Sequence, residues 1–276
     1  MARRACSSIK VMAQLALLGA LALHLLACAT VPGTGRNQLS LVGDSELNTM
    51  AADQYKEMVQ KGPLSTNQKD TAMIKNVGAK ISRAAETYLS ENGLASEIPS
   101  YNWEFNLIES KDVNAFCMPG GKVAFYTGIL PFCQNADGVA VIMGHEVAHA
   151  IAHHSRERAS QQLMTSIGGT LLSVGLGAGG ASGLTSEVAM AAYGLGSEVG
   201  ILLPYSRSHE SEADRIGLSL MAMAGYNPEA AVGFWERMSE ASGSGQANFL
   251  STHPSDQKRI ADIKKFLPEA MSRYKK

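Results

Sequence analysis

The feature that most constrains this chain is the segment His-Glu-Val-Ala-His at residues 145–149. Two histidines four positions apart lie on one face of a helix, so both imidazoles can reach a single metal ion. Glu146 then lies beside the metal rather than on it, where a carboxylate can act as a general base. The pattern predicts a zinc hydrolase with a third ligand elsewhere. Because it arises by chance in on the order of one chain in a hundred of this length, its context has to be tested.

The surrounding helix is strongly apolar. Asn135 or Asp137 is expected to cap it, and between residues 139 and 151 the one charged side chain other than histidine is Glu146. Burying a carboxylate in apolar surroundings is costly, so its presence here indicates a use. Charged residues return at 156–158, where the helix is expected to emerge into water.

The N-terminal residues have the pattern of an export signal. A basic start is followed by an apolar run over residues 11–27, which is short for a spanning helix. The run ends in Leu-Leu-Ala-Cys28, which resembles the lipobox of bacterial lipoproteins, in which the Cys carries the lipid. The alternative is an ordinary signal peptide or an N-terminal anchor with an incidental Cys.

The lipoprotein interpretation predicts three parts and a location. Residues 1–27 are the signal peptide, 28–43 the lipidated Cys and a tether, and 44–276 the zinc metallopeptidase domain. By resemblance to Gram-negative lipoproteins, Ala29 rather than Asp favours the periplasmic side of the outer membrane, with a lipid anchor on Cys28. The net charge of -1 gives no reason to expect a nucleic-acid partner.

Hydrophobic periodicity predicts a mainly helical α+β fold with a small sheet next to the metal-binding helix. The first expected elements are a helix capped by Asp44 or Ser45 that runs to about residue 61, a helix over 66–90, and strands over 102–107, 113–117 and 122–127. An edge strand there can pair with an extended substrate and hold its scissile peptide over the metal. Pro119-Gly-Gly121 joins the last two strands, and a plain hairpin turn is the alternative to a role in binding.

Residues 159–206 are rich in glycine and carry Glu187 and Glu198 as their only charges. One interpretation is a mobile helical hairpin or lid over the site, in contact with membrane. The favoured one is two small-residue helices packed on the core, because the run is only weakly hydrophobic for a spanning helix. Another helix is expected to open near residue 207, and a last amphipathic helix follows a Ser-Thr-His-Pro-Ser segment at 251–255.

Spacing alone leaves the third metal ligand open. A third histidine ten residues after the first is excluded, because that position is Ser155. His153 and His154 are interpreted as residues of the helix end, since one helix cannot wrap three consecutive turns of histidine around a tetrahedral ion without a bend. The candidates that remain are the acidic residues Glu187, Glu198, Glu210 and Glu212.

Several motifs together resemble the gluzincin zinc metallopeptidase family of the CAAX prenyl proteases and HtpX. They occur in family order as Asn114-Ala-Phe, Pro119-Gly-Gly, Gly144-His-Glu-x-x-His, Ser206-Arg-x-x-Glu-x-x-x-Asp and His253-Pro-x-x-x-x-Arg. The chain is most similar to the bacterial lipoprotein and periplasmic branch typified by LoiP and BepA. This resemblance implies a zincin fold, one Zn²⁺ per chain and a match over most of the mature chain.

The resemblance also implies residue roles. It places His145, His149 and Glu210 on the zinc, makes Glu146 the general base, and makes Asp214 the group that orients a ligand histidine. His253 is expected to block the zinc at rest or to help the transition state, and Arg259 to stabilise the oxyanion. Asn114, Gly120 and Gly121 are the expected substrate-binding residues of the strand region.

The predicted function is that of a membrane-tethered zinc metalloendopeptidase. Extended-strand binding implies unfolded or misassembled substrates, which for this branch means quality control of cell-envelope proteins, with envelope assembly machinery as a possible partner. A non-proteolytic chaperone or assembly lipoprotein that keeps a zinc site is the alternative, which the intact Glu146 disfavours. A membrane-embedded protease is a third option. Cys117 and Cys133 are either a disulfide or two buried thiols.

Overall fold

The computed structural model describes residues 28–178, 207–242, 249–253 and 257–274. Its strands and α-helices are β1 (Cys28–Thr30), β2 (Asn37–Leu39), α2 (Asp44–Lys61), α3 (Gln68–Glu91), β3 (Glu104–Ile108), β4 (Ala115–Met118), β5 (Lys122–Tyr126), α4 (Leu130–Cys133), α5 (Ala136–Ile151), α6 (His154–Ala178), α8 (Arg207–Met223), α9 (Ala230–Ser242), α10 (Phe249–Thr252) and α11 (Gln257–Arg273). The expected mainly helical α+β fold with a small sheet is confirmed. The predicted signal peptide and the second half of the glycine-rich stretch lie outside the described residues.

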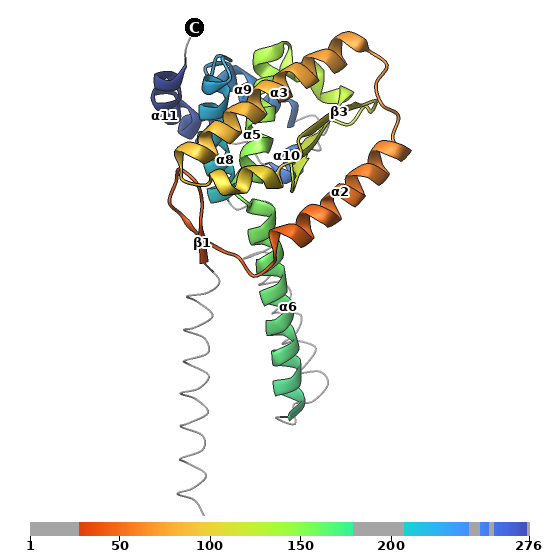
Figure 1. The fold of residues 1–276 in the computed structure, drawn as a ribbon, viewed down its shortest axis with the longest axis vertical. Coiled ribbons are helices and arrows are strands. Elements are labelled where there is room, and N and C mark those ends of the chain that lie inside the picture. The colour runs from red at the N-terminus through yellow and green to blue at the C-terminus, as the bar shows by residue number, and fades with distance from the viewer. Residues whose placement is uncertain (1–27, 179–206, 243–248, 254–256, 275–276) are drawn as a thin grey trace, which may run out of the picture.

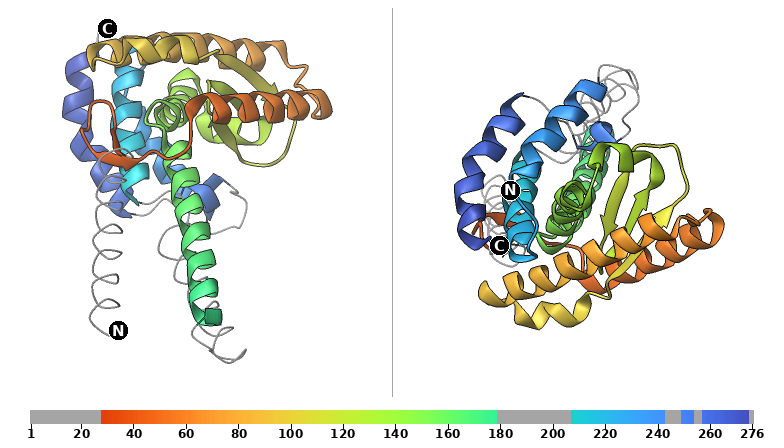
Figure 2. Two further views of the ribbon diagram at one scale, coloured as in Figure 1. Left: turned by 60° about the horizontal axis from the view of Figure 1, so that its bottom comes forward. Right: turned by 90° about the horizontal axis from the view of Figure 1, so that it is seen from above.

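Helix α5 is the centre of the molecule (Figures 1 and 2). Asn135 caps it as expected, because its side chain accepts a hydrogen bond from the backbone N–H of Gly138 at 3.0 Å. Every residue from Gly138 to His149 is buried. Helices α3 and α8 and the edge of the sheet surround α5, so its apolar sequence is buried and its two histidines are each 2% exposed.

The contact between α5 and α8 is made by backbone atoms. A Cβ added at Gly144 would lie 2.8 Å from the carbonyl oxygen of Gly217, and one at Gly217 would lie 2.9 Å from the backbone nitrogen of His145. Real side chains do not approach that closely, so both positions need glycine. This close crossing brings His145 beside the first turns of α8, where Glu210 and Asp214 lie.

Gly217→Ala is expected to destabilise the protein by about 1–3 kcal/mol, because the methyl group must separate the two helices. The same separation should weaken zinc binding, since His145 and the acidic residues of α8 lie on opposite sides of the crossing. Denaturant unfolding of the metal-free protein, together with zinc titration, measures both effects.

The matched control is Gly233→Ala on α9, where the nearest atom to an added Cβ is the mobile end of Arg237 at 3.3 Å. It should leave stability unchanged or raise it by up to about 1 kcal/mol through helix propensity. Equal unfolding free energies and zinc affinities for the two variants would contradict the backbone-contact interpretation.

The sheet has the strand order β3-β5-β4, with β3 parallel and β4 antiparallel to β5. Its strands begin and end within three residues of the expected positions. The turn between β4 and β5 contains Gly120 at φ +76° and Gly121 at φ +84°, a conformation that glycine adopts without strain. The backbone oxygens of both glycines accept hydrogen bonds from the chain that leads into β3, so the turn is fixed in place.

The segment expected to be a tether packs against the body. Strands β1 and β2 pair as a small antiparallel hairpin. Val31 lies in the main hydrophobic core with 1% of its surface exposed, and Arg36 makes ion pairs with Glu157 and Glu212. Whether residue 44 marks a domain boundary stays a prediction.

The expectation that the chain emerges into water at residues 156–158 is wrong for two of the three positions. Arg156 and Glu157 are buried, because Arg156 pairs with Asp44 at 2.6 Å and Glu157 pairs with Arg36 at 2.7 Å. Helix α6 projects from the body only beyond this point (Figure 1). No helix that the structure describes is long and apolar enough to cross a membrane.

Candidate active site

Four buried side chains from three segments converge beneath the sheet edge. His145 and His149 come from α5, Glu210 from α8, and His253 from the residue that follows α10. One ligand atom of each lies within 4.8 Å of those of the others. The structure thus brings together the two predicted histidines, the predicted third ligand and the predicted gate. Among the described residues, this is the cluster suited to a metal ion.

The donor geometry fits tetrahedral zinc. The Nε2 atoms of His145 and His149 are 3.1 Å apart, and they lie 3.4 Å and 3.3 Å from the two carboxylate oxygens of Glu210. Ligands about 2.05 Å from a tetrahedral ion are separated by about 3.3 Å. Burial lowers the pKa of His149 well below its usual value, which keeps its nitrogen lone pair available. Burial alone would raise the pKa of Glu210, but hydrogen bonds from the three histidines lower it, so it is a carboxylate.

Asp214 occupies the position expected for an orienting group. Its Oδ1 is 3.0 Å from Nδ1 of His145, which leaves the Nε2 atom of that ring facing the cluster. Arg259 holds the same carboxylate with two hydrogen bonds of 2.8 Å, from Nε and Nη2. The arrangement of carboxylate, histidine and metal position is the one that fixes the tautomer of a ligand histidine in zinc sites.

Arg259 is more enclosed than its expected role in oxyanion binding suggests. Its Nη1 lies 2.8 Å from Glu210, and its guanidinium stacks 3.5 Å from the ring centre of Trp235. The side chain is therefore committed to the carboxylates of the site and to an aromatic face. Its role toward a substrate oxyanion stays a prediction.

Glu146 has the environment of a general base. It is 3% exposed, and its Oε1 has no hydrogen-bond partner among the described residues. Burial raises the pKa of Glu146, although the nearby His253 and His145 and a backbone hydrogen bond with Cys117 oppose the shift. A buried carboxylate oxygen without a partner is costly unless water or substrate uses it. This oxygen lies 3.4 Å from Nε2 of His253 and beside the tetrahedral donor set, which is the position of a general base for a zinc hydrolase.

His253 fills the space next to these donors. Its Nδ1 is 3.1 Å from Glu210 and 3.2 Å from Nε2 of His145, and its Nε2 is 3.4 Å from Glu146. The ring stacks on Phe249, with ring centres 4.6 Å apart. His253 therefore stands where the fourth ligand of the metal would be, between the metal position and the base.

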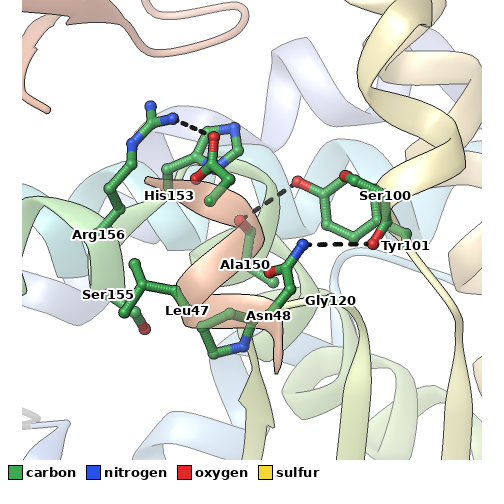
Figure 3. Close-up of a pocket in the computed structure, with 11 residues that line it drawn as sticks. Leu47, Asn48, Ser100, Tyr101, Gly120, Ala150, His153, Ser155 and Arg156 are labelled. Carbon is green, nitrogen blue, oxygen red and sulfur yellow. Dashed lines mark hydrogen bonds and ion pairs between the residues drawn. The ribbon is translucent and has the colours of Figure 1, made fainter. Parts of the chain in front are cut away.

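The predicted substrate-binding residues lie along the sheet edge. Asn114 precedes the edge strand β4, and its side-chain oxygen accepts from the backbone N–H of Ala115. Cys117 of the same strand contacts Glu146, so β4 borders the base. Gly120 lines a small pocket at the end of α5 (Figure 3). The other residues that Figure 3 labels there are Leu47, Asn48, Ser100, Tyr101, Ala150, His153, Ser155 and Arg156.

The two histidines after α5 have different roles. His153, at φ +55°, turns toward this pocket and lies 2.8 Å from Glu97, away from the metal position. His154 was expected to be a plain residue of the helix end, but it begins α6 and contacts Nδ1 of His149 at 2.7 Å. The sequence signal for this contact was the position of His154, five residues after His149. Helical periodicity does not predict the contact, because the chain breaks between α5 and α6.

Cys117 and Cys133 are both buried and both free. Burial raises the pKa of the Cys117 thiol well above its usual value and that of Cys133 to about 12. Of the two possibilities that the sequence left open, the structure has the pair of buried thiols.

Comparison with known proteins identifies the family. A sequence model of peptidase family M48 matches residues 76–267. The mitochondrial metalloendopeptidase OMA1 of Schizosaccharomyces pombe is 36% identical over 244 residues, 87% of this chain and 66% of that protein. The human enzyme of the same name is 27% identical over 248 residues, 87% of this chain and 46% of its own length. The β-barrel assembly-enhancing protease of Escherichia coli is 28% identical over 171 residues, 59% of this chain and 34% of that protein.

These matches correct one expectation and limit another. The predicted location on the periplasmic side of an outer membrane is wrong, because the relatives from yeasts, a plant and mammals are named as mitochondrial enzymes. The predicted bacterial lipoprotein branch is not confirmed. The chain spans 66% of the fission-yeast relative and 57% of the budding-yeast one, so the relatives carry further sequence.

The matched region contains the whole candidate site, from the edge strand β4 to Arg259. The family and the names of the relatives bear out the expectation of zinc and of a metalloendopeptidase. Since the family model covers more than half of the chain and its span encloses the His145–His149–Glu210 cluster, the chain belongs to peptidase family M48.

Proposed function

We propose that the protein is a zinc metalloendopeptidase that cleaves peptide bonds in unfolded or extended polypeptides. The observation that carries the proposal is the buried Glu146 carboxylate, which makes no hydrogen bond through Oε1 to any described residue and adjoins three donors at tetrahedral spacing. A zinc site that serves structure alone needs no carboxylate base beside it. The zinc-binding assembly factor without proteolytic activity is therefore the weaker alternative.

In this proposal His145, His149 and Glu210 hold the zinc, and Asp214 keeps the first of them in the right tautomer. When bound, zinc polarises the scissile carbonyl and makes a bound water acidic, with a pKa of about 7. Glu146 accepts the proton of that water through Oε1 and later donates it to the leaving amine. Arg259, fixed by Asp214 and Glu210, contributes positive charge at the site.

Substrate binding is proposed to use the free side of strand β4. β4 pairs with β5 on one side only and is the edge of the three-stranded sheet. An extended peptide added there would run past Asn114, which precedes the strand, and Cys117, whose backbone is hydrogen-bonded to Glu146. Main-chain pairing of this kind requires a flexible or unfolded substrate, while Gly120 and Gly121 keep the strand end in register.

His253 is proposed to be a gate. The support is its position 3.1–3.4 Å from Glu210, His145 and Glu146, because a substrate carbonyl would need the same space to approach the donors and the base. His253→Ala is therefore expected to raise basal cleavage of a fluorescent casein several-fold with the same zinc content. A loss of activity instead would assign the ring to catalysis rather than to gating.

Membrane contact is proposed for the projecting part of α6. Leu163, Met164, Ile167, Leu171 and Val174 form an exposed apolar row there, and residues 159–178 carry no charge. Strand β1, which starts at Cys28, lies at the end of the body from which α6 projects (Figure 1). Cys28, the proposed attachment residue, and this row would thus face one lipid surface.

Cell fractionation tests the membrane proposal in a Cys28→Ser chain, which cannot carry the predicted lipid. Adding Leu171→Asp and Val174→Asp should release more of the chain into the soluble fraction. The matched substitution Met50→Asp, at an exposed apolar residue of α2, should leave the distribution unchanged. Equal release by both would contradict the assignment of α6.

The proposed activity is tested by zinc analysis of the purified full-length chain, together with cleavage of unfolded casein before and after treatment with 1,10-phenanthroline. We expect one zinc per chain, loss of cleavage on chelation and recovery on adding zinc. A zinc-loaded protein that cleaves neither casein nor itself, including with His253→Ala, would favour the assembly-factor alternative.

A further inference from the structure

A second buried polar cluster lies behind the candidate metal site, between α6 and α8. Each helix contributes a histidine and a glutamate three residues apart: His154 and Glu157 on α6, and His209 and Glu212 on α8. All four are buried. They pair crosswise, with Nε2 of His154 at 3.0 Å from Glu212 and Nε2 of His209 at 2.8 Å from Glu157. The two rings stack with their centres 4.4 Å apart.

The N-terminal hairpin completes this cluster. Arg36, between β1 and β2, donates from Nε to Glu212 at 2.9 Å and from Nη2 to Glu157 at 2.7 Å. The hydroxyl of Thr34 also donates to Glu212. One guanidinium thus bridges the carboxylates of both helices. Buried carboxylates are costly without such partners. The hairpin therefore offsets the free-energy cost of burying Glu157 and Glu212.

The cluster contacts the metal site through a hydrogen bond between His154 and His149. Nδ1 of His154 lies 2.7 Å from Nδ1 of His149, whose Nε2 faces the other metal donors. A metal on Nε2 leaves the proton of His149 on Nδ1, which must then donate to Nδ1 of His154. That assignment puts the proton of His154 on Nε2, where it donates to Glu212. With a metal on Nε2 of His149, this chain of hydrogen bonds therefore fixes the tautomers of both rings.

We propose that His154 is a positioning residue for the metal ligand His149, and that Glu212 and the hairpin residues Thr34 and Arg36 hold it in place. The inference rests on the proposed function only in taking His145, His149 and Glu210 as the metal ligands. Asp214 orients His145 directly, whereas His149 is oriented by an imidazole backed by a carboxylate. The consequence is that residues 28–39 belong to the metal site and set its affinity.

The experiment compares zinc affinity across variants of the full-length chain in detergent, by competition with a chromophoric chelator. His154→Phe removes the acceptor and keeps an aromatic ring, and it should weaken zinc binding by about 10- to 100-fold, as loss of an outer partner of a ligand does. Arg36→Gln should weaken it by up to about 10-fold, and Arg36→Lys should restore most of the loss. The control, Arg215→Gln, removes an exposed ion pair of α8 with Glu269 and should leave zinc affinity unchanged.

Two further readouts separate positioning from simple support of the fold. The visible absorption bands of the Co²⁺-substituted protein should shift in His154→Phe and Arg36→Gln, because the ligand field depends on the orientation of His149. Thermal unfolding of the metal-free variants reports stability alone. A lowered unfolding temperature with wild-type zinc affinity and cobalt bands would overturn the proposal and leave the cluster as a brace between helices.

If His154→Phe does not fold, Arg36→Gln provides the test, since the Arg36 side chain is 28% exposed and lies outside the metal cluster. Wild-type zinc affinity in Arg36→Gln would then overturn the role of the hairpin. A wild-type chain that binds zinc tightly but cleaves no casein would refute the proposed function. The zinc affinities of the variants would still test the positioning role of His154. A chain that cleaves casein, with variants that bind zinc normally, would refute the positioning role alone.

Discussion

Glu146→Gln is expected to lower peptide cleavage by about 10³-fold or more while zinc remains bound. General-base catalysis contributes about 10²- to 10⁴-fold, and Glu146 is the buried carboxylate that adjoins the metal position without belonging to the donor cluster. An amide has nearly the same size but cannot accept the proton of a bound water. The zinc should stay, because the cluster of donors does not include Glu146.

The measurement is cleavage of fluorescent casein alongside zinc content for the wild type and the variant. Asp137→Asn is a suitable control on the same helix, since its carboxylate accepts from the backbone N–H of Asn227, far from the donors. Normal cleavage by Glu146→Gln would remove Glu146 from the mechanism. Loss of zinc along with cleavage would show that the carboxylate serves the metal site rather than the reaction.

The local part of the site was predictable because it lies on one helix. His145, Glu146 and His149 are set by helical spacing, and the apolar sequence of α5 predicted a buried helix with a costly carboxylate in it. Asn135 was one of two expected caps, and the side-chain hydrogen bond identifies it. A period of two residues similarly placed the strands of the small sheet.

The third ligand could not be predicted from spacing, because nothing in a linear pattern says which acid of a distant helix faces the metal. Four glutamates were candidates, and the resemblance to a family, rather than physics, favoured Glu210. The structure supplies the reason: α5 and α8 touch through Gly144 and Gly217, and this crossing aims Glu210 at the histidines. Two of the other candidates, Glu187 and Glu198, lie outside the described residues.

The buried charges around Arg36 were missed for a related reason. Charged residues at 156–158 are typical of a solvated helix end, and a segment with Pro32 and two glycines is typical of a tether. Each charge of the pair is costly to bury alone, and only the fold shows that Arg36 meets Glu157 and Glu212. Single-sequence patterns cannot detect compensation between segments that are about 120 residues apart.

Glu210→Gln is expected to weaken zinc binding by more than about 100-fold. Removing even an outer partner of a ligand histidine costs about 10- to 100-fold in affinity, and Glu210 supplies a ligand oxygen directly at 3.3–3.4 Å from both histidine nitrogens. The amide is neutral and offers one weak donor oxygen. The metal-free protein should also lose about 3–5 kcal/mol, because Arg259 is left with an incomplete set of carboxylate partners in a buried site.

The control for this variant is Glu236→Gln on α9, which removes a carboxylate that is half exposed and 3.6 Å from Lys264. It should keep wild-type zinc affinity and stability, since exposed ion pairs contribute at most about 1 kcal/mol. Zinc content after dialysis against a chelator, and unfolding of the metal-free proteins, distinguish the two. If Glu210→Gln retained its zinc as the control does, the third ligand would have to be His253, which already stands 3.2 Å from Nε2 of His145, and its ring would be a permanent ligand rather than a gate.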